Sequence, residues 1–268
     1  MSFNSLRLFV ILLSTLLTSC MCTDEHVALA PVTSEFKSGP VGSAGEQTPV
    51  YLDTLGNILG YYEYLPPSFV VGKQSLPVLF YWNGSNAISG NGRDELTNLL
   101  TQGLPQFISE GRDFPAIIIS ATVPDWRGND VRPFVNYILK KYSGSYNPGK
   151  VYMSGFSAGG GITVRYAAKY PETLTAIVPI APAAQKPKFY QPSRKMADIP
   201  SWFFHNEGDT KVRAWRSEVW HEGLKEIGGN HRITINPGGS HYAWQSTYNN
   251  PAMWEWLLSQ DKLLVSDS

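Results

Sequence analysis

Short apolar runs alternate with amphipathic segments along most of this chain. Residues 77–82 and 116–120 are typical of the runs, which suit strands that are buried on both faces. Residues 130–142 are typical of the segments between them, because their apolar side chains recur at the spacing of one helical face. Strands that alternate with helices predict an α/β domain with a mostly parallel sheet and helices on both faces. The predicted strands are residues 50–52 and 60–65, as an antiparallel pair, then 77–82, 116–120, 151–153, 176–180, 201–205 and 232–236, and the predicted helices are about 95–100, 130–142, 158–170, 213–227 and 252–258.

The N-terminus has a different pattern. Residues 1–19 carry one charged side chain, Arg7, followed by an apolar run to Leu17 that is short for a membrane span and predicts an export signal. The run ends in Leu17-Thr18-Ser19-Cys20, which resembles a bacterial lipobox, so we expect Cys20 to be lipidated. An ordinary signal peptide and an uncleaved anchor remain alternatives. The expected division is a signal at 1–19, a polar tether at 20–47 and a folded domain at 48–268, exported and lipid-anchored to the bacterial cell envelope on its periplasmic or outer side.

Composition narrows the function classes. The chain has 268 residues, 43% of them hydrophobic, which is enough for one sizeable α/β domain. Its 22 basic and 22 acidic side chains balance, so a nucleic-acid partner is not expected. Both cysteines, Cys20 and Cys22, precede the domain, and the histidines lack the H-x-x-x-H spacing of a zinc site. We therefore expect no metal and no organic cofactor; the oligomeric state cannot be read.

A glycine-rich turn stands out within the alternating pattern. Gly155-Phe156-Ser157-Ala158-Gly159 matches G-x-S-x-G, after a predicted strand and before a predicted helix. In such a turn the residues two before and two after the serine are pressed together, so both must lack side chains. The motif predicts a nucleophilic serine, although a glycine-rich loop that merely begins a helix would look the same.

An acid and a base follow in the order that such a serine requires. Asp209 and His241 each come just after a predicted strand, and both lie in glycine-containing loops. A serine needs a histidine within hydrogen-bond reach, and the histidine needs a carboxylate that orients it. Glu207 is the alternative acid, whereas Asp198 precedes a strand and so lies at the wrong end of it. His205 is expected to be a structural histidine that supports the acid loop.

The loop after Trp82 is the expected partner of this turn. A tetrahedral intermediate needs N–H donors for its oxyanion, and we expect these to be the backbone of Ala158 and of Ser85. Substrate contacts are expected from Asn83, Asn86, Trp126 and Trp244. We expect the connection at residues 182–200 to lie at the rim above this turn, and it is too short for a large lid.

Several longer segments carry a family resemblance. They are Tyr62-Glu63-Tyr64-Leu65-Pro66-Pro67, residues 82–92, Asp125-Trp126, residues 155–161, Phe204-His205-Asn206-Glu207-Gly208-Asp209, Gly239-Ser240-His241-Tyr242-Ala243-Trp244 and residues 250–258. Together they resemble the α/β-hydrolase superfamily, and within it secreted bacterial esterases related to dienelactone hydrolase, polyhydroxybutyrate depolymerases, and feruloyl or acetyl-xylan esterases. Phospholipase/carboxylesterase and predicted-peptidase types belong to the same group. The resemblance implies the α/β-hydrolase fold, with Ser157 as nucleophile, Asp209 as acid and His241 as base.

The chain departs from this group at two positions. Asn83-Gly84 stands where the group usually has His-Gly, and Ala158 stands where it often has Met or Gln. Neither change removes a catalytic group, but both leave the choice of substrate open. The expected function is a serine-dependent carboxylic ester hydrolase that forms an acyl-enzyme, with a small-molecule ester or an acetylated or feruloylated glycan as substrate. The alternatives are a prolyl-oligopeptidase-like peptidase and a non-catalytic glycan-binding surface lipoprotein.

Overall fold

The computed structural model describes residues 42–55, 58–85, 93–121, 130–184 and 196–265. The predicted signal, Cys20 and most of the predicted tether lie outside these residues, so the division of the chain remains a prediction. Within the described ranges, no helix is both long enough and apolar enough to cross a bilayer.

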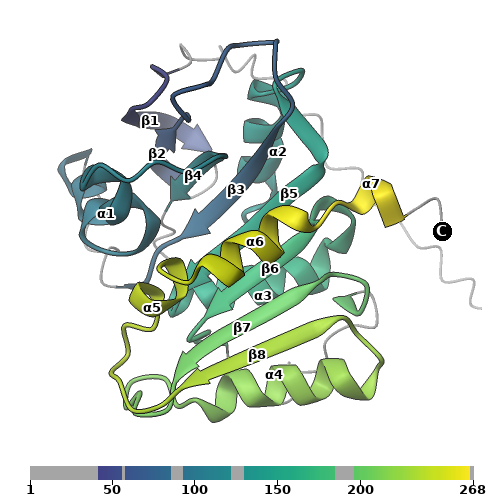
Figure 1. Ribbon diagram of the computed structural model, residues 1–268. Coiled ribbons are helices and arrows are strands. Elements are labelled where there is room, and N and C mark those ends of the chain that lie inside the picture. Colours follow the sequence, from purple (N-terminus) through teal and green to yellow (C-terminus); the bar gives the residue numbers. More distant parts are fainter. Residues whose placement is uncertain (1–41, 56–57, 86–92, 122–129, 185–195, 266–268) are drawn as a thin grey trace, which may run out of the picture. The chain divides into compact units, whose positions relative to one another are not determined.

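An eight-stranded sheet organises the described residues, in the order β1-β2-β4-β3-β5-β6-β7-β8 (Figure 1). From β4 to β8 all neighbouring strands are parallel, while β1 and β2 form an antiparallel pair and β2 joins β4 antiparallel. The predicted mostly parallel sheet is therefore confirmed. The strands are β1 (Gln47–Leu55), β2 (Ile58–Tyr64), β3 (Leu76–Trp82), β4 (Ile117–Ala121), β5 (Tyr146–Phe156), β6 (Ala176–Ile180), β7 (Ser201–Asn206) and β8 (His231–Asn236).

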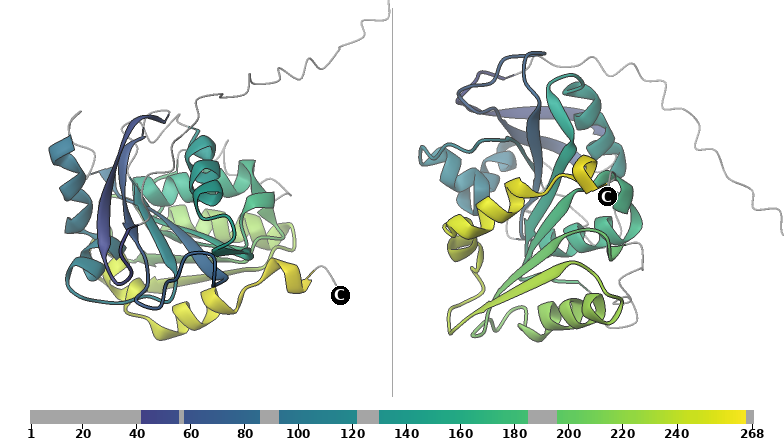
Figure 2. Two further views of the ribbon diagram at one scale, coloured as in Figure 1. Left: turned by 90° about the horizontal axis from the view of Figure 1, so that it is seen from above. Right: turned by 45° about the vertical axis from the view of Figure 1, so that its right-hand side comes forward.

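Helices cover both faces of this sheet. Buried residues of α2, α3 and α4 pack on one face, and those of α1, α5 and α6 pack on the other, as Figure 1 and Figure 2 show from three directions. The helices are α1 (Gly103–Ser109), α2 (Arg132–Lys141), α3 (Ala158–Lys169), α4 (Trp215–Glu226), α5 (Trp244–Tyr248), α6 (Pro251–Ser259) and α7 (Lys262–Val265), with 3₁₀ turns η2 (Arg93–Thr101) and η3 (Pro171–Thr173).

The central strands β3 and β4 are almost entirely apolar because each face of the sheet has its own core. In β3, Phe80 packs with the helices of one face and Tyr81 with those of the other, since successive strand side chains point to opposite sides. Ile117 and Ile118 of β4 divide in the same way. A strand buried on both faces shows no alternation in its sequence, as expected for the centre of a parallel sheet.

The sequence pattern misses or shortens several elements. It misses α1, whose seven residues include Pro105 and begin with Gly103 at a positive φ of 71°, because both residue types weaken a helical pattern. It also misses α5, which is only five residues long. Strand β5 begins earlier than predicted because Tyr146 pairs with Leu76 of β3, although Pro148 and Gly149 interrupt the apolar run.

A buried ion pair links β2 to the end of α2. Lys141 Nζ lies 2.5 Å from Glu63 Oε2, with 1% and 0% of the two side chains exposed. The other carboxylate oxygen accepts the Gly42 N–H at 3.0 Å. The Tyr61 hydroxyl accepts a hydrogen bond from Lys141 Nζ at 3.2 Å. Burial, and to a smaller extent the negative charge of Glu63, raises the pKa of the Tyr61 phenol, so this hydroxyl stays protonated. Removal of one partner of such a pair leaves an uncompensated buried charge, which strongly lowers the free energy of unfolding.

We expect Lys141→Met to lower the free energy of unfolding by about 3–5 kcal/mol, because it leaves the Glu63 carboxylate buried without its cation. Denaturant titration measures the loss, and Lys140→Met is the control, since Lys140 is exposed next to it in α2. Combining Lys141→Met with Glu63→Gln should recover part of the stability. Equal stabilities of the Lys140 and Lys141 variants would refute the buried pair.

Candidate active site

The parallel strands bring the predicted residues to one edge of the sheet. Ser157 follows β5, Asp209 follows β7 and His241 follows β8, each within five residues of the strand's last residue. The Asn83 loop follows β3, the neighbour of β5. Carboxyl ends of parallel strands meet at the same edge, where α/β proteins place their sites.

Ser157 occupies a strained turn between β5 and α3. Its φ of 56° and ψ of −113° lie where residues other than glycine are rare. The turn is held by three main-chain hydrogen bonds: Ser157 donates its N–H to Ile180 at 2.9 Å, and its carbonyl accepts from Gly161 and Ala183 at 3.0 and 2.9 Å. The strain is therefore maintained by the end of β6 as well as by α3.

The glycines around Ser157 are required by close backbone approach. A Cβ on Gly155 would overlap the main chain of Gly159, as the motif predicts. A Cβ on Gly159 would also overlap the carbonyls of Trp82 and Asn83, at the end of β3. A Cβ on Gly160 would lie 2.8 Å from the carbonyl oxygen of Ile180, at the end of β6. The turn is thus wedged between the ends of both neighbouring strands.

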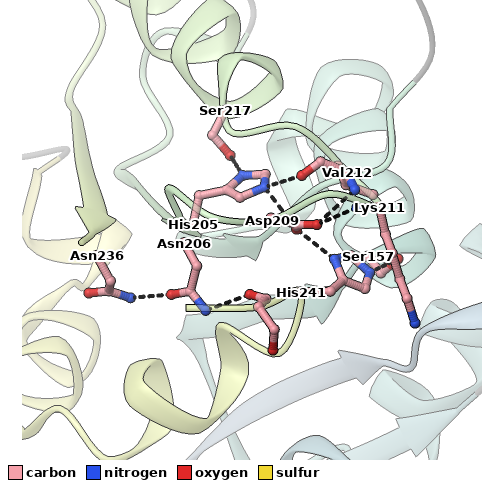
Figure 3. A network of polar contacts seen from close by, with 10 residues as sticks. Ser157, His205, Asn206, Asp209, Lys211, Val212, Ser217, Asn236 and His241 are labelled. Carbon is pink, nitrogen blue, oxygen red and sulfur yellow. Dashed lines mark hydrogen bonds and ion pairs between the residues drawn. The ribbon is translucent and has the colours of Figure 1, made fainter. Parts of the chain in front are cut away.

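Ser157, His241 and Asp209 form one hydrogen-bonded chain (Figure 3). His241 Nε2 lies 2.9 Å from Ser157 Oγ, and His241 Nδ1 lies 2.6 Å from Asp209 Oδ2. All three side chains are buried, with 7%, 8% and 0% of Ser157, His241 and Asp209 exposed. The alternative acid, Glu207, is exposed and accepts only the Gly238 N–H, at 3.4 Å. The carboxylate that reaches His241 is that of Asp209.

The acid loop holds Asp209 in its ionised form. Oδ1 accepts the backbone N–H groups of Lys211 and Val212 at 2.8 and 2.9 Å. Burial alone raises the pKa of this carboxyl, but hydrogen bonds from His241 and from the two N–H groups outweigh burial and hold the pKa below its usual value. A carboxylate that stays charged can orient an imidazole and stabilise its protonated form.

Two asparagines at matching strand ends fix the loop that carries His241. Asn206 and Asn236 are cross-strand partners at the ends of β7 and β8, and Asn236 Nδ2 donates to Asn206 Oδ1 at 2.9 Å. Asn206 Nδ2 in turn donates to the Ser240 carbonyl at 2.7 Å. Neither asparagine was predicted to have a role in the site. The available sequence signal is that two neighbouring strands both end in asparagine.

The two predicted oxyanion donors come from the start of α3 and from the loop after β3. Ala158 is the first residue of α3, a position whose N–H has no acceptor within the helix. Ser85 is exposed and comes directly after Asn83 and Gly84, both of which are buried. Gly84 packs near the Phe156 ring, since a Cβ there would lie 3.0 Å from it.

The predicted substrate contacts are placed unequally. Asn86 and Trp126 lie outside the described residues. Asn83 is 2% exposed, and its amide oxygen accepts the Gly84 N–H at 3.0 Å, so this side chain shapes its own loop. Trp244 is 4% exposed and packs edge-on against Phe107, with ring centroids 5.6 Å apart, which leaves little surface for a ligand.

Two exposed side chains near His241 were missed. Tyr242 is 39% exposed, with its ring centroid 6.2 Å from that of His241 and 6.1 Å from that of Phe156. The ammonium of Lys211 lies 5.5 Å from the centre of the Tyr242 ring.

The described part of the chain contains no cluster of three or more His, Cys, Asp or Glu side chains placed to hold a metal ion.

We expect Gly159→Ala to lower kcat by about 10²-fold or more, because the added methyl would lie 1.9 Å from the Trp82 carbonyl oxygen and must push the turn away from the end of β3 by about an ångström. Gly161→Ala is the matched control in the same helix, since its nearest neighbour would lie 3.3 Å from the new Cβ. Ester-hydrolysis kinetics per correctly folded molecule measures both. Similar activities for the two variants would contradict the wedged turn.

Comparison with known proteins gives one partial family match. A family model described as "Serine aminopeptidase, S33" matches residues 125–227. A search of the curated proteins finds no match.

Solved structures share the fold at low sequence identity. A thermostable esterase is 24% identical with a TM-score of 0.60, over 81% of this chain, and this chain covers 63% of that one. A truncated carbohydrate esterase from gut microbiota is 14% identical with a TM-score of 0.59, over 82% and 98% of the two chains. A ferulic acid esterase is 15% identical with a TM-score of 0.55, over 79% and 98%. The chain therefore has the α/β fold of these esterases, and its Ser157, His241 and Asp209 are hydrogen-bonded in the order of a serine hydrolase.

Proposed function

We propose that this protein hydrolyses carboxylic esters through Ser157, His241 and Asp209. The observation that carries the proposal is the continuous chain from Ser157 Oγ to His241 Nε2, at 2.9 Å, and from His241 Nδ1 to Asp209 Oδ2, at 2.6 Å. A serine hydroxyl is a weak nucleophile until a base within this distance takes its proton.

The reaction has two halves. In the first, Ser157 Oγ bonds to the acyl carbon while His241 Nε2 takes the hydroxyl proton, and the alcohol then leaves with that proton as the acyl-enzyme forms. In the second, His241 takes a proton from water, the hydroxide attacks the acyl carbon, and Ser157 departs with the proton. Asp209 remains ionised throughout and stabilises the imidazolium.

The negative charge on the carbonyl oxygen develops next to the first turn of α3. The free N–H of Ala158 is the first donor, and helix N-termini favour negative charge. We assign the second donor to the backbone of Ser85, on the loop that contacts Gly159 through Trp82 and Asn83. No metal or organic cofactor enters these steps.

For the substrate, we propose esters of glycans that carry acetyl or feruloyl groups. The similarity to structures named as a carbohydrate esterase and a ferulic acid esterase supports this choice. The proposal keeps the expected lipidation of Cys20, which would hold the domain at the cell envelope, where polymer-derived esters are met.

A peptidase is the second candidate, because the family model that matches residues 125–227 is described as a serine aminopeptidase. The same triad serves both reactions, so the leaving group separates the two candidates. A non-catalytic glycan-binding protein is the third reading. This reading gives no functional reason for the strained backbone of Ser157 or for the buried, ionised carboxylate of Asp209.

We expect Ser157→Ala to lower kcat on p-nitrophenyl acetate by about four to six orders of magnitude, because nucleophile and base act as a unit. Ser109→Ala is the control, since Ser109 is exposed at the end of α1. A fluorophosphonate probe should label the native protein and the Ser109 variant, and leave the Ser157 variant unlabelled. If the probe does not label the native protein, the esterase proposal fails and the non-catalytic glycan-binding reading is favoured.

A matched substrate panel tests the acyl and leaving groups. We expect feruloylated or acetylated oligosaccharides to exceed the methyl and trifluoroethyl esters of the same acid by about tenfold or more in kcat/KM, which corresponds to ~1.4 kcal/mol of contacts with the sugar. Because a sugar alkoxide is a better leaving group than methoxide, the trifluoroethyl ester of the same acid is the control for leaving-group acidity, and only the excess over that ester reports contacts with the sugar. Equal values would remove the glycan proposal, and faster cleavage of an aminoacyl anilide than of the aminoacyl ester would favour the peptidase.

A further inference from the structure

A second histidine is buried directly behind the acid of the triad. His205 is 0% exposed near the end of β7, and its Nε2 lies 2.8 Å from the Val212 carbonyl and 3.2 Å from Asp209 Oδ2. On the other side of its ring, Nδ1 lies 2.7 Å from the hydroxyl of Ser217, which is also 0% exposed and belongs to the first turn of α4. Figure 3 shows the ring between Ser217 and the acid loop.

These contacts determine which ring nitrogen carries the hydrogen. A carbonyl oxygen can only accept, so the short contact to Val212 requires a hydrogen on Nε2. Burial lowers the pKa of His205, against smaller opposing effects of the Val212 carbonyl and of Asp209, so the ring is neutral near pH 7. Nδ1 of a neutral ring with a hydrogen on Nε2 is a bare acceptor, and it must receive the Ser217 hydroxyl hydrogen.

The same contacts restrain the catalytic carboxylate. Asp209 Oδ2 accepts from His241 and from His205, while Oδ1 accepts from the backbone of Lys211 and Val212. With donors on both oxygens, rotation of the carboxylate breaks hydrogen bonds whichever way it turns. His205 also bridges the two sides of the loop, because its Nε2 contacts both Asp209 and Val212.

We propose that His205 is a positioning residue of the reaction, and that Ser217 supports this role by donating its hydroxyl hydrogen to Nδ1, which holds the ring in the orientation in which Nε2 faces Asp209 and Val212. The proposal deepens the proposed function, because it assigns two further residues to the same triad. In the opposite tautomer, the Nε2 lone pair would face the Val212 carbonyl and the Asp209 carboxylate. That repulsion would turn Asp209 away from His241.

The first test observes the tautomer itself. Imidazole ¹⁵N chemical shifts at pH 7, with the His205 signals identified by their absence in His205→Gln, should show a protonated Nε2 and an unprotonated Nδ1. In Ser217→Ala the Val212 carbonyl still requires a hydrogen on Nε2, so we expect the tautomer to stay and the Nδ1 signal to shift because it loses its hydrogen-bond donor. A hydrogen on Nδ1 in the native protein would overturn the proposal.

The second test separates the hydroxyl from the space it fills. Ser217→Thr and Ser217→Val add the same bulk to α4, but only threonine keeps the donor. Per active site titrated with a fluorophosphonate, we expect Ser217→Val to have a kcat about tenfold below that of Ser217→Thr, since small misplacements of a catalytic group are costly. KM for p-nitrophenyl acetate should agree between the two, because neither residue contacts substrate.

The outcomes are separable from those of the proposed function. Equal kcat values for the Thr and Val variants would overturn the positioning role, even if both variants are less stable than the native protein. A fall in melting temperature alone, with kcat per titrated site unchanged, would also overturn it and assign Ser217 to stability. If the native protein hydrolyses no ester, the proposed function fails, while the ¹⁵N measurement still decides the tautomer.

Discussion

The close approach of α3 to the ends of β3 and β6 is the constraint on which the site depends. It places the Ser157 turn against main-chain atoms of both neighbouring strands, where only glycines at positions 155, 159 and 160 fit. The strained φ of Ser157 is a consequence, because the chain must reverse between β5 and α3 without leaving this contact. Gly159 contacts the start of the loop after β3, so the nucleophile and the two proposed oxyanion donors depend on one packing contact.

The residues at the end of β7 position the other two members of the triad, Asp209 and His241. His205 contacts the loop that carries Asp209, and the adjacent Asn206 contacts the loop that carries His241. Neighbouring side chains on a strand point to opposite sides, so one strand end can hold two loops at once. Acid and base are therefore both positioned from the end of β7.

The sequence predicted the sheet and the triad because both depend on local signals. Apolar runs revealed the strands, and glycine-rich loops after three of them revealed Ser157, Asp209 and His241. The short helices α1 and α5 escaped because five or seven residues carry too little periodicity. The link from His205 to Ser217 escaped for another reason: it joins a strand to a helix across the core, and a buried serine in a helix has no pattern that distinguishes it from a surface serine.

Strand β8 has a consequence for how the protein fails when heated. It is the last strand of the sheet, pairs only with β7, and its residues are half-buried or exposed, yet it carries His241. Trp202 of β7 donates to Thr234 at 3.0 Å, and the Arg232 guanidinium lies 5.2 Å from the centre of the Trp202 ring. These contacts are modest, and edge elements open before central ones. Local separation of β8 would take the base away from its serine while the central strands stay paired, so thermal inactivation is expected to precede loss of the fold.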